Sequence, residues 1–284
     1  MEKSEFVWLN EELVPLDQAR VSVNDRGFLY GDGFFETLLA VKGHLHFLEE
    51  HLTRLRTSAQ AFRLPFPENF SWEENLKRLL SANGLEQGLA RVKVLLSRGV
   101  AAAFGLPGEA RPTLVIWAQP YTPPSPEEYA RGWALSTFPE RRSTFTGRYK
   151  SLNYLFYLAA RQYALDQGAK EALILEADGL VSEGAATNFI YTREGGFYAP
   201  QTPSALPGVT LDILGRTLAR RGLAFKYLPT TAPQLAQAEG LWLTNSLLGV
   251  MPVSSWDGRT LPISGATKLL QECLALEAQS IPKD

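Results

Sequence analysis

The sequence predicts an α+β fold with two lobes, and three observations support this prediction. Residues 120–126 contain four prolines, which fix φ and lack an N–H donor, so we expect a linker there between lobes at residues 1–119 and 127–284. Helical and strand patterns alternate only irregularly along the chain, and glycine turns between short strands are frequent. Both features disfavour a doubly wound parallel sheet and favour two mixed α/β lobes.

The N-terminal lobe is expected to contain four strands and two helices. Apolar residues recur at spacings of four and three from Leu48 to Phe62, which places one apolar stripe on a helix. Ser71 and Glu74 have the spacing of a capping box that begins a second helix, and Asn83 with the glycine after it ends that helix. The strands are expected at residues 6–9, 13–14, 89–97 and 112–118.

The C-terminal lobe is expected to contain three helices. The first is the apolar segment 152–167, and the second begins at Pro207-Gly208 and ends before Gly222. The third begins near Ala266, with Ser264 as its cap. Short apolar segments bounded by glycine turns predict strands at residues 171–176, 187–192, 197–199 and 241–244.

Charge and composition exclude several classes of protein. The 28 Lys and Arg residues against 30 Asp and Glu residues give a net charge of −2, so no basic excess is available for nucleic acid or an anionic membrane surface. No apolar run approaches the ~20 residues that span a bilayer, and no leader pattern is visible, so we expect a cytoplasmic protein. The single cysteine, Cys273, permits no internal disulfide. Because His44, His46 and His51 lack further ligands in a metal-binding pattern, no metal site is expected.

Lys150 is the candidate nucleophile. It lies directly before an apolar segment and near three arginines, at positions 141, 142 and 148. Apolar, cation-rich surroundings lower the pKa of an amine, which then becomes a nucleophile able to form a Schiff base. A solvated lysine near the start of a helix is the alternative interpretation.

Two features could bind an anion such as a phosphate. Gly208, Val209 and Thr210 stand at the expected start of a helix, where unpaired N–H groups and the helix dipole attract anions. Arg54 lies off the apolar stripe of its helix and carries a fork of donors. A plain capped turn and a solvated arginine are the alternative interpretations.

Two further segments have the composition of a pocket wall. Glu183 lies among small residues directly before an apolar strand, and a carboxylate buried there needs a cationic or N–H partner, such as a protonated ring nitrogen. Residues 25–36 combine glycines with aromatic and charged residues, which suits a close approach of the backbone to a ligand. For Glu183, an exposed loop acid is the alternative.

These segments belong to six motifs that follow one another along the chain. They are Asp25-Arg26-Gly27 with Gly31-Asp32-Gly33-Phe34-Phe35-Glu36, His51-Leu52-Thr53-Arg54-Leu55, Lys150-Ser151-Leu152-Asn153-Tyr154, Glu183-Gly184 with Thr187-Asn188-Phe189, Leu206-Pro207-Gly208-Val209-Thr210, and Thr244-Asn245-Ser246. Taken together they resemble the class IV aminotransferases, the fold-type IV enzymes that use pyridoxal phosphate. The resemblance covers nearly the whole chain.

The resemblance implies a two-lobed fold-type IV enzyme that uses pyridoxal 5′-phosphate and whose C-terminal lobe carries the cofactor lysine. Lys150 would hold the cofactor covalently and act as general base, while Glu183 pairs with the pyridine nitrogen and makes the ring an electron sink. A small amino substrate and a homodimer are also implied, although the sequence itself indicates no dimer surface. The other implied contacts are Arg54, Asn188, Val209, Thr210 and Ser246 for the cofactor and Phe35, Lys93 and Asn245 for the substrate.

Within the family, the sequence favours 4-amino-4-deoxychorismate lyase, which forms 4-aminobenzoate and pyruvate in folate synthesis. Residues 243–253 and 31–37 resemble that enzyme. An aminotransferase of D-amino acids or branched-chain amino acids is the alternative. Residues 99–103, Gly-Val-Ala-Ala-Ala, lack the Pro-Arg-x-His carboxylate clamp of the D-amino-acid enzymes, and residues 150–153 lack the Gly-rich stretch of the branched-chain enzymes. Leu211 stands where many relatives have arginine.

Overall fold

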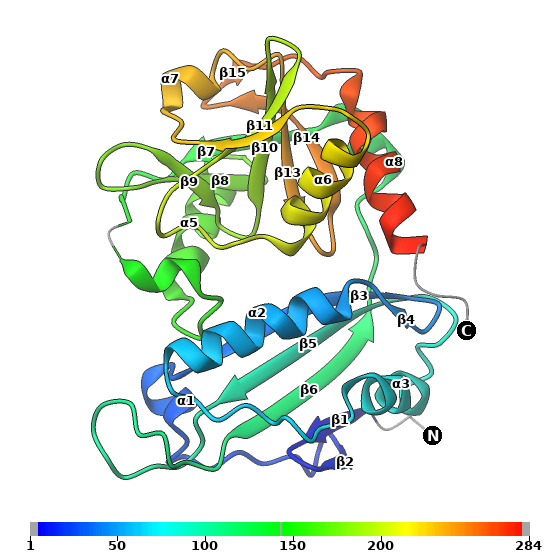
Figure 1. The fold of residues 1–284 in the computed structure, drawn as a ribbon, viewed down its shortest axis with the longest axis vertical. Helices are drawn as coiled ribbons and strands as arrows, with labels where there is room; N and C mark the ends of the chain where they lie inside the picture. The colour runs from blue at the N-terminus through cyan, green and yellow to red at the C-terminus, as the bar shows by residue number, and fades with distance from the viewer. Residues whose placement is uncertain (1–4, 143, 280–284) are drawn as a thin grey trace. The chain divides into compact units, whose positions relative to one another are not determined.

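The computed structural model describes residues 5–142 and 144–279 and divides into two compact units (Figure 1). The first unit comprises Met1–Thr122 together with Tyr149–Asn153, and the second comprises Pro123–Arg148 together with Tyr154–Asp284. The division after residue 122 lies inside the expected linker segment. No helix of the described ranges is both long and apolar enough to cross a membrane.

Lys150 belongs to the first unit, and not to the C-terminal lobe in which the sequence placed it. The reason is backbone pairing with the third strand of that unit. Phe35 N donates to Lys150 O over 2.8 Å, and Leu152 N donates to Gly33 O over 2.9 Å. The following helix therefore begins at Leu155 rather than at residue 152.

The first unit is built on a six-stranded antiparallel sheet. Its elements are β1 (Phe6–Leu9), β2 (Glu12–Pro15), α1 (Arg26–Tyr30), β3 (Gly33–Val41), β4 (His44–Leu45), α2 (Leu48–Ala61), α3 (Trp72–Ala82), β5 (Leu89–Ser97) and β6 (Thr113–Pro120). The strand order is β2-β1-β6-β5-β3-β4. The predicted strands β1, β2, β5 and β6 and both predicted helices are confirmed, whereas β3 and β4 were missed.

One face of this sheet forms the core of the first unit. Because side chains alternate along a strand, Phe34 and Leu38 of β3 and Val94 of β5 all point to the same side. Leu55 of α2 and Leu76 of α3 pack against them, so both helices cover that face. The predicted capping box of α3 is wrong, because the side chain of the N-cap residue Ser71 makes no capping hydrogen bond.

The Pro-rich segment is more regular at its ends than the sequence predicts. Pro120 is the last residue of β6, and Pro126 is the first residue of α4 (Pro126–Arg131). Ser125 caps this helix in a capping box with Glu128. A proline has no N–H to lose at the first position of a helix, so Pro126 favours the helix instead of preventing it.

The second unit is built on a nine-stranded mixed sheet in the order β12-β11-β10-β13-β14-β7-β8-β9, with β15 paired to β14. The pairs β11–β12, β14–β7 and β7–β8 are parallel, and the others are antiparallel. The remaining elements are β7 (Trp133–Thr137), η1 (Phe145–Arg148), α5 (Leu155–Asp166), β8 (Glu171–Leu175), β9 (Val181–Gly184), β10 (Asn188–Arg193), β11 (Gly196–Pro200), α6 (Val209–Arg220), β12 (Phe225–Leu228), α7 (Ala232–Leu235), β13 (Gly240–Asn245), β14 (Gly249–Trp256), β15 (Arg259–Thr260) and α8 (Ala266–Gln279).

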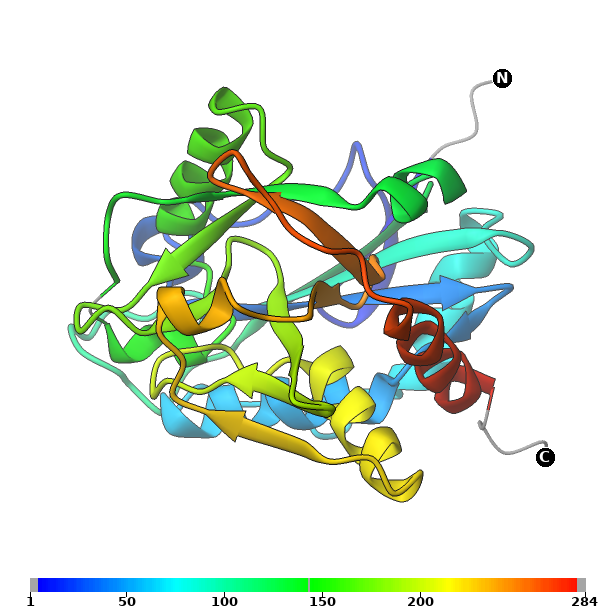
Figure 2. The same ribbon diagram turned by 90° about the horizontal axis from the view of Figure 1, so that it is seen from above.

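Helices cover this larger sheet in two groups. α6 and α8 lie side by side in Figures 1 and 2, and their apolar residues, such as Leu214 and Leu270, pack around the buried indole of Trp242. α5 packs on β7 and β8 through Ala160 and Ala164. Helices on mixed and antiparallel sheets match the predicted α+β class, with no doubly wound sheet in the described residues.

Candidate active site

Segment 25–36 of the first unit is organised by a partly buried carboxylate that two arginines share. Asp32 accepts from Arg26 Nε over 2.8 Å and from Arg98 Nε over 2.7 Å. Although burial opposes the charged form, Arg98 and Arg26 lower the pKa of Asp32. Arg98 has no exposed surface and also donates to the backbone oxygens of Phe62, Arg63 and Pro107. The hydrogen bonds of Arg98 therefore stabilise the fold, and Arg98 does not bind a substrate carboxylate.

Three predicted site residues of the first unit meet at one aromatic ring. Lys150 Nζ lies 4.5 Å from the centre of the Phe35 ring, and Lys93 Nζ lies 4.8 Å from the same centre. Burial, with Arg91 nearby, lowers the pKa of Lys93. Within the described part of the chain, Lys93 has no ion pair with a carboxylate. A primary amine and a second cation thus lie beside one ring of β3.

Arg54, the predicted phosphate ligand, is bound by a buried carboxylate of β3. Its Nε donates to Glu36 Oε1 over 2.8 Å, and its Nη2 donates to Glu36 Oε2 over 2.5 Å. His51 Nδ1 lies 2.7 Å from the same Oε2. Burial works against ionisation, but Arg54 and His51 lower the pKa of Glu36 to about 2. His51 is only 1% exposed, so its ring is buried beside Glu36.

In the second unit Glu183 lies in β9 and is 3% exposed, so its interpretation as an exposed loop acid is wrong. Its Oε1 accepts from Arg142 Nη1 and from the Tyr157 hydroxyl, the latter over 3.1 Å. Its Oε2 accepts from Leu206 N over 3.0 Å. The carboxylate is therefore held from three sides. Sequence reasoning gave Arg142 no role toward Glu183 and missed Tyr157, because both partners are distant in sequence.

The protonation states of this cluster follow from its burial and charges. Burial raises the pKa of Glu183, and the Arg142 guanidinium opposes this effect. Although burial disfavours its charge, the Glu183 carboxylate raises the pKa of Arg142, which therefore stays a cation. Burial and Glu183 also raise the pKa of Tyr157, whose hydroxyl stays a donor. Glu176 is the second carboxylate partner of Arg142 and accepts from its Nη2 over 2.7 Å.

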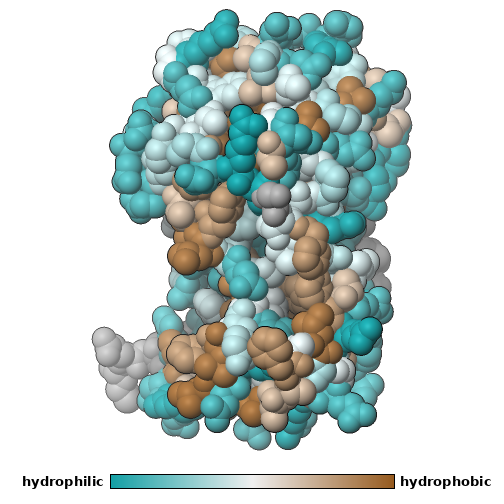
Figure 3. All heavy atoms as spheres, turned by 90° about the vertical axis from the view of Figure 1, so that its left-hand side faces the viewer, coloured by the Kyte–Doolittle hydropathy of each residue, from teal (hydrophilic) through white to brown (hydrophobic). Residues whose placement is uncertain are grey.

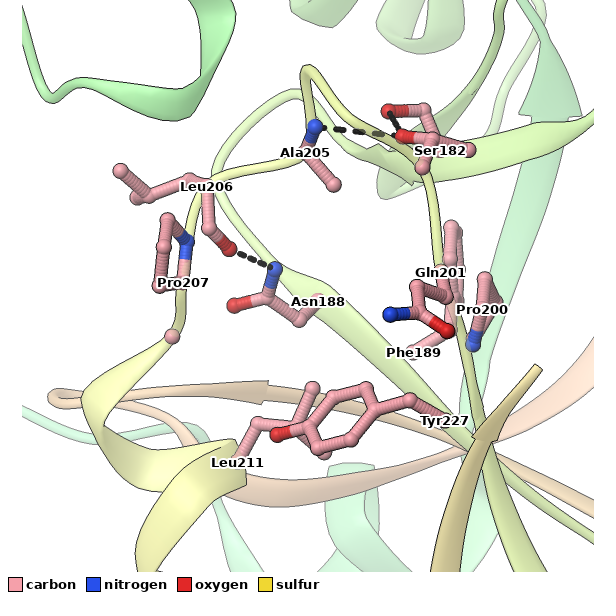
Figure 4. A pocket seen from close by; sticks show the side chains of 12 residues that line it. Ser182, Asn188, Phe189, Pro200, Gln201, Ala205, Leu206, Pro207, Leu211 and Tyr227 are labelled. Atoms are coloured by element: carbon pink, nitrogen blue, oxygen red, sulfur yellow. Dashed lines mark hydrogen bonds between the residues drawn. The ribbon is translucent and has the colours of Figure 1, made fainter. Parts of the chain in front are cut away.

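The turn before α6 is supported by Asn188 (Figure 4). Asn188 Nδ2 donates to Leu206 O over 2.9 Å, and a Cβ added to Gly208 would meet Asn188 Oδ1 at 2.0 Å. Gly208 is the N-cap residue of α6, so the N–H groups of Val209 and Thr210 open the helix without intrahelical acceptors. A cavity of about 240 Å³ borders this turn. The turn has the geometry that binds phosphates at helix ends.

Asn245 and Ser246 lie where β13 turns into β14. Asn245 Oδ1 accepts from Leu247 N over 3.0 Å and from Leu248 N over 2.7 Å. Its Nδ2 donates to Ala186 O over 3.0 Å. Most of the hydrogen-bonding capacity of Asn245 toward the described residues thus stabilises the turn.

The structure gathers the predicted residues into two groups, one in each unit. In the first unit Phe35, Lys93 and Lys150 share one ring contact, while Arg54 lies on α2 in its pair with Glu36. In the second unit Leu206 links two predicted residues, because its N–H binds Glu183 and its carbonyl binds Asn188. Among the described residues, no group of three or more His, Cys, Asp and Glu side chains could hold a metal ion.

A family model described as amino-transferase class IV matches residues 33–256 of this chain. A proposed branched-chain-amino-acid aminotransferase of Methanocaldococcus jannaschii is 31% identical over 274 residues, which cover 94% of each chain. A D-alanine aminotransferase of Staphylococcus epidermidis is 29% identical over 276 residues, covering 94% of this chain and 95% of the relative. These relatives are named as aminotransferases and not as the lyase that the sequence favoured.

Two solved structures of branched-chain amino acid aminotransferases are similar to this chain. The branched-chain amino acid aminotransferase of a T.th. strain, in complex with N-(5′-phosphopyridoxyl)-L-glutamate, is 26% identical, with a TM-score of 0.85 over 99% of this chain and 96% of that chain. The branched-chain amino acid aminotransferase of Escherichia coli has a TM-score of 0.87 over 99% of this chain and 97% of that chain, at 24% identity. The predicted fold-type IV architecture is confirmed by these superpositions.

Proposed function

Because the chain belongs to the class IV aminotransferase family, we propose that it is a pyridoxal-phosphate-dependent aminotransferase whose amino donor is a branched-chain amino acid. The observation that carries the proposal is the placement of Lys150 and Lys93 beside the Phe35 ring. An amine that can form a Schiff base, a cation that can bind a carboxylate and an apolar surface are what an apolar amino acid requires.

Pyridoxal 5′-phosphate is the cofactor of this chemistry, and the residues present suit its groups. Glu183 is a buried carboxylate for a protonated ring nitrogen, and Lys150 is the amine for the aldehyde. Arg54, the first N–H groups of α6 at Val209 and Thr210, and Ser246 are the proposed phosphate ligands. When bound, pyridoxal phosphate supplies the electron sink that allows the α-proton of an amino acid to leave.

The protein residues have distinct tasks in this proposal. Lys150 would hold the cofactor, and its free amine would act as the general base for the α-proton. Glu183 keeps the ring nitrogen protonated, and Arg142 and Tyr157 orient its carboxylate through the hydrogen bonds described above. Asn188 supports the phosphate turn rather than the phosphate itself. Lys93 binds the substrate carboxylate on the face of the sheet that holds Phe35.

The D-amino-acid alternative has less support. The loop after β5 provides no exposed guanidinium near its start, because Arg98 is buried on Asp32 and on backbone oxygens. Arg26 is likewise bound, to Asp32 and to the carbonyl groups of Ala103 and Gly105. Neither arginine therefore replaces the missing Pro-Arg-x-His motif as a ligand of the substrate carboxylate.

A second candidate is 4-amino-4-deoxychorismate lyase, favoured by two observations. Segment 243–253 resembles that enzyme and forms the hairpin of β13 and β14. Arg91 and Lys93, two residues apart on β5, lie on one face and could bind a substrate with two carboxylates. This reaction ends with the cofactor unchanged, so it requires no keto-acid acceptor.

One assay separates the candidates. The purified protein is supplied with L-leucine or L-valine and either 2-oxoglutarate or pyruvate, with D-alanine and 2-oxoglutarate, with L-glutamate and pyruvate, and separately with aminodeoxychorismate alone. We expect acceptor-dependent transfer from the branched-chain donors. Equal release of 4-aminobenzoate and pyruvate without an acceptor, together with no amino transfer, would establish the lyase.

Covalent attachment is tested independently of the substrate. Borohydride treatment of the yellow protein should fix the cofactor mass to the peptide that contains Lys150, and Lys150→Ala should abolish this labelling. A colourless protein that gains no absorbance with added pyridoxal phosphate would refute the cofactor assignment.

We also propose that the enzyme is a homodimer. Phe28 and Tyr30 of α1 and Phe104 of the loop after β5 are exposed, Phe104 by 97%. Figure 3 shows apolar residues among hydrophilic ones on the side where Figure 1 labels α1. Arg26 donates to the carbonyl groups on both sides of Phe104, which restrains the backbone that carries this exposed ring. Light scattering should give twice the mass of the chain, and Phe104→Ser should shift the protein toward the monomer.

A further inference from the structure

A carboxylate lies in the core of the first unit where the strand pattern calls for an apolar side chain. β3 places Glu36 between Phe34 and Leu38, on the face that packs against α2. Their exposures are 1% for Glu36, 3% for Phe34 and 1% for Leu38. Burying an ionised carboxylate in such a place costs free energy unless it is paired and hydrogen-bonded. The side chains that bind Glu36 therefore indicate its role.

Both partners of Glu36 come from α2 and are three residues apart, so they lie on one side of that helix. Arg54 binds the carboxylate through Nε and Nη2, and His51 binds it through Nδ1. Because an ionised carboxylate only accepts, Nδ1 of His51 carries a proton. Burial lowers the pKa of His51, so the ring is neutral and Arg54 is the cation that balances Glu36.

The three side chains lie at different depths. The side chains of His51 and Glu36 are 1% and 2% exposed, whereas that of Arg54 is 13% exposed. The guanidinium therefore lies at the edge of the core. A carboxylate that takes one Nε and one Nη2 hydrogen fixes the plane of a guanidinium and directs its remaining N–H groups away from that carboxylate.

We propose that Glu36 and His51 are positioning residues that hold the Arg54 guanidinium in the orientation in which it binds the phosphate of the cofactor. The inference rests on the proposed function, in which Arg54 is a phosphate ligand. An arginine side chain has many rotamers in solution, and the contact with Glu36 restricts them when the protein folds. The entropy of Arg54 is therefore lost before binding and does not weaken the phosphate contact.

The test compares two ligands that differ only in the phosphate. Full-length apoprotein is titrated with pyridoxal phosphate and with pyridoxal, and absorbance gives both dissociation constants. Glu36→Gln removes the charge at constant shape, and Glu36→Asp keeps the charge but withdraws the carboxylate by one methylene. Both variants should raise the dissociation constant of pyridoxal phosphate about tenfold, which is the equivalent of one charge-assisted hydrogen bond. The dissociation constant of pyridoxal should stay unchanged. Glu49→Gln, which removes an exposed carboxylate from the same helix, is the matched control.

A double-variant cycle with Arg54→Ala assigns the effect to its partner. In the Arg54→Ala background, the Glu36 variants should cause no further loss of pyridoxal phosphate affinity. Equal losses for both ligands, or the same loss with and without Arg54, would mean a structural role only and overturn the proposal. If Glu36→Gln does not fold, as judged by circular dichroism, the affinities of Glu36→Asp for the two ligands decide whether the proposal holds.

The outcome also separates this inference from the proposed function. If Arg54→Ala lowers the affinity for pyridoxal phosphate while the Glu36 variants do not, only the positioning role is wrong. If Arg54→Ala itself leaves the affinity unchanged, Arg54 is no phosphate ligand and both statements are wrong. His51→Asn, whose amide nitrogen can replace Nδ1 as donor, should retain more affinity than His51→Leu.

Discussion

Replacing Arg142 by methionine should destabilise the protein strongly, because two carboxylates of the second unit would lose their cation. Arg142 donates to Glu183 and Glu176 and also to the hydroxyl groups of Tyr157 and Ser182. Removing one partner of a buried ion pair costs about 3–5 kcal/mol. Hydrogen bonds to charged groups, at about 1.5–3 kcal/mol each, give a similar sum for the two carboxylates.

The expected magnitude is therefore about 4 kcal/mol. A loss of this size lowers Tm by roughly 8–16 °C in a chain of this length. Thermal unfolding followed by circular dichroism measures it. Arg141→Met is the matched control, because Arg141 is exposed and its one hydrogen bond within residues 5–142 and 144–279 goes to Ala177 O, over 3.3 Å. A Tm of Arg142→Met within about 2 °C of the wild type would refute the argument from unpaired carboxylates.

The destabilisation should also depend on pH. Because burial raises the folded-state pKa of Glu183 above 4.5, the stability linked to this group is present below pH 4.5 and is lost as the pH rises through the raised value. Arg142 limits that loss in the wild type. The difference in Tm between the wild type and Arg142→Met should therefore widen from about pH 4 to about pH 7. Adding Glu183→Gln, which removes one of the two orphaned charges, should recover part of the lost stability.

Three further predictions concern the cofactor and the substrate. Glu183→Gln should keep the cofactor bound but slow α-proton abstraction by at least about 100-fold, which stopped-flow absorbance with a deuterated donor would measure, and unchanged turnover would refute its role. Lys93→Met should raise KM for the amino donor about tenfold with a smaller change in kcat, whereas an unchanged KM would place the substrate carboxylate elsewhere. Gly208→Ala should weaken pyridoxal phosphate binding in the same titration used for Arg54, because its Cβ would meet Asn188 Oδ1 at 2.0 Å, and wild-type affinity would show that the turn does not bind the phosphate.

Local signals in the sequence were sufficient for much of the fold. The apolar spacing from Leu48 to Phe62 corresponds to α2, and Pro207-Gly208 directly precedes α6, because periodicity and turn residues act over a few neighbours. β3 was missed because its first four residues belong to segment 25–36, whose glycines and charged residues suggest a pocket wall, and because Glu36 interrupts the apolar pattern on its buried face. An analysis that classifies each residue by its own polarity does not predict that a charged side chain is buried.

The sequence by itself determined which residue types were present for the chemistry, namely a lysine, a carboxylate, an arginine and a helix start in a specific order. Only the tertiary structure decided how they are held. Glu36 and Arg54 are 18 residues apart, and Arg142 and Glu183 are 41 apart, yet each pair shares hydrogen bonds. Such pairs depend on strand register and helix packing, which bring distant side chains within about 3 Å of each other and are not encoded in any short window of sequence. For the same reason, Lys150 joined the first unit through its backbone bond to Phe35.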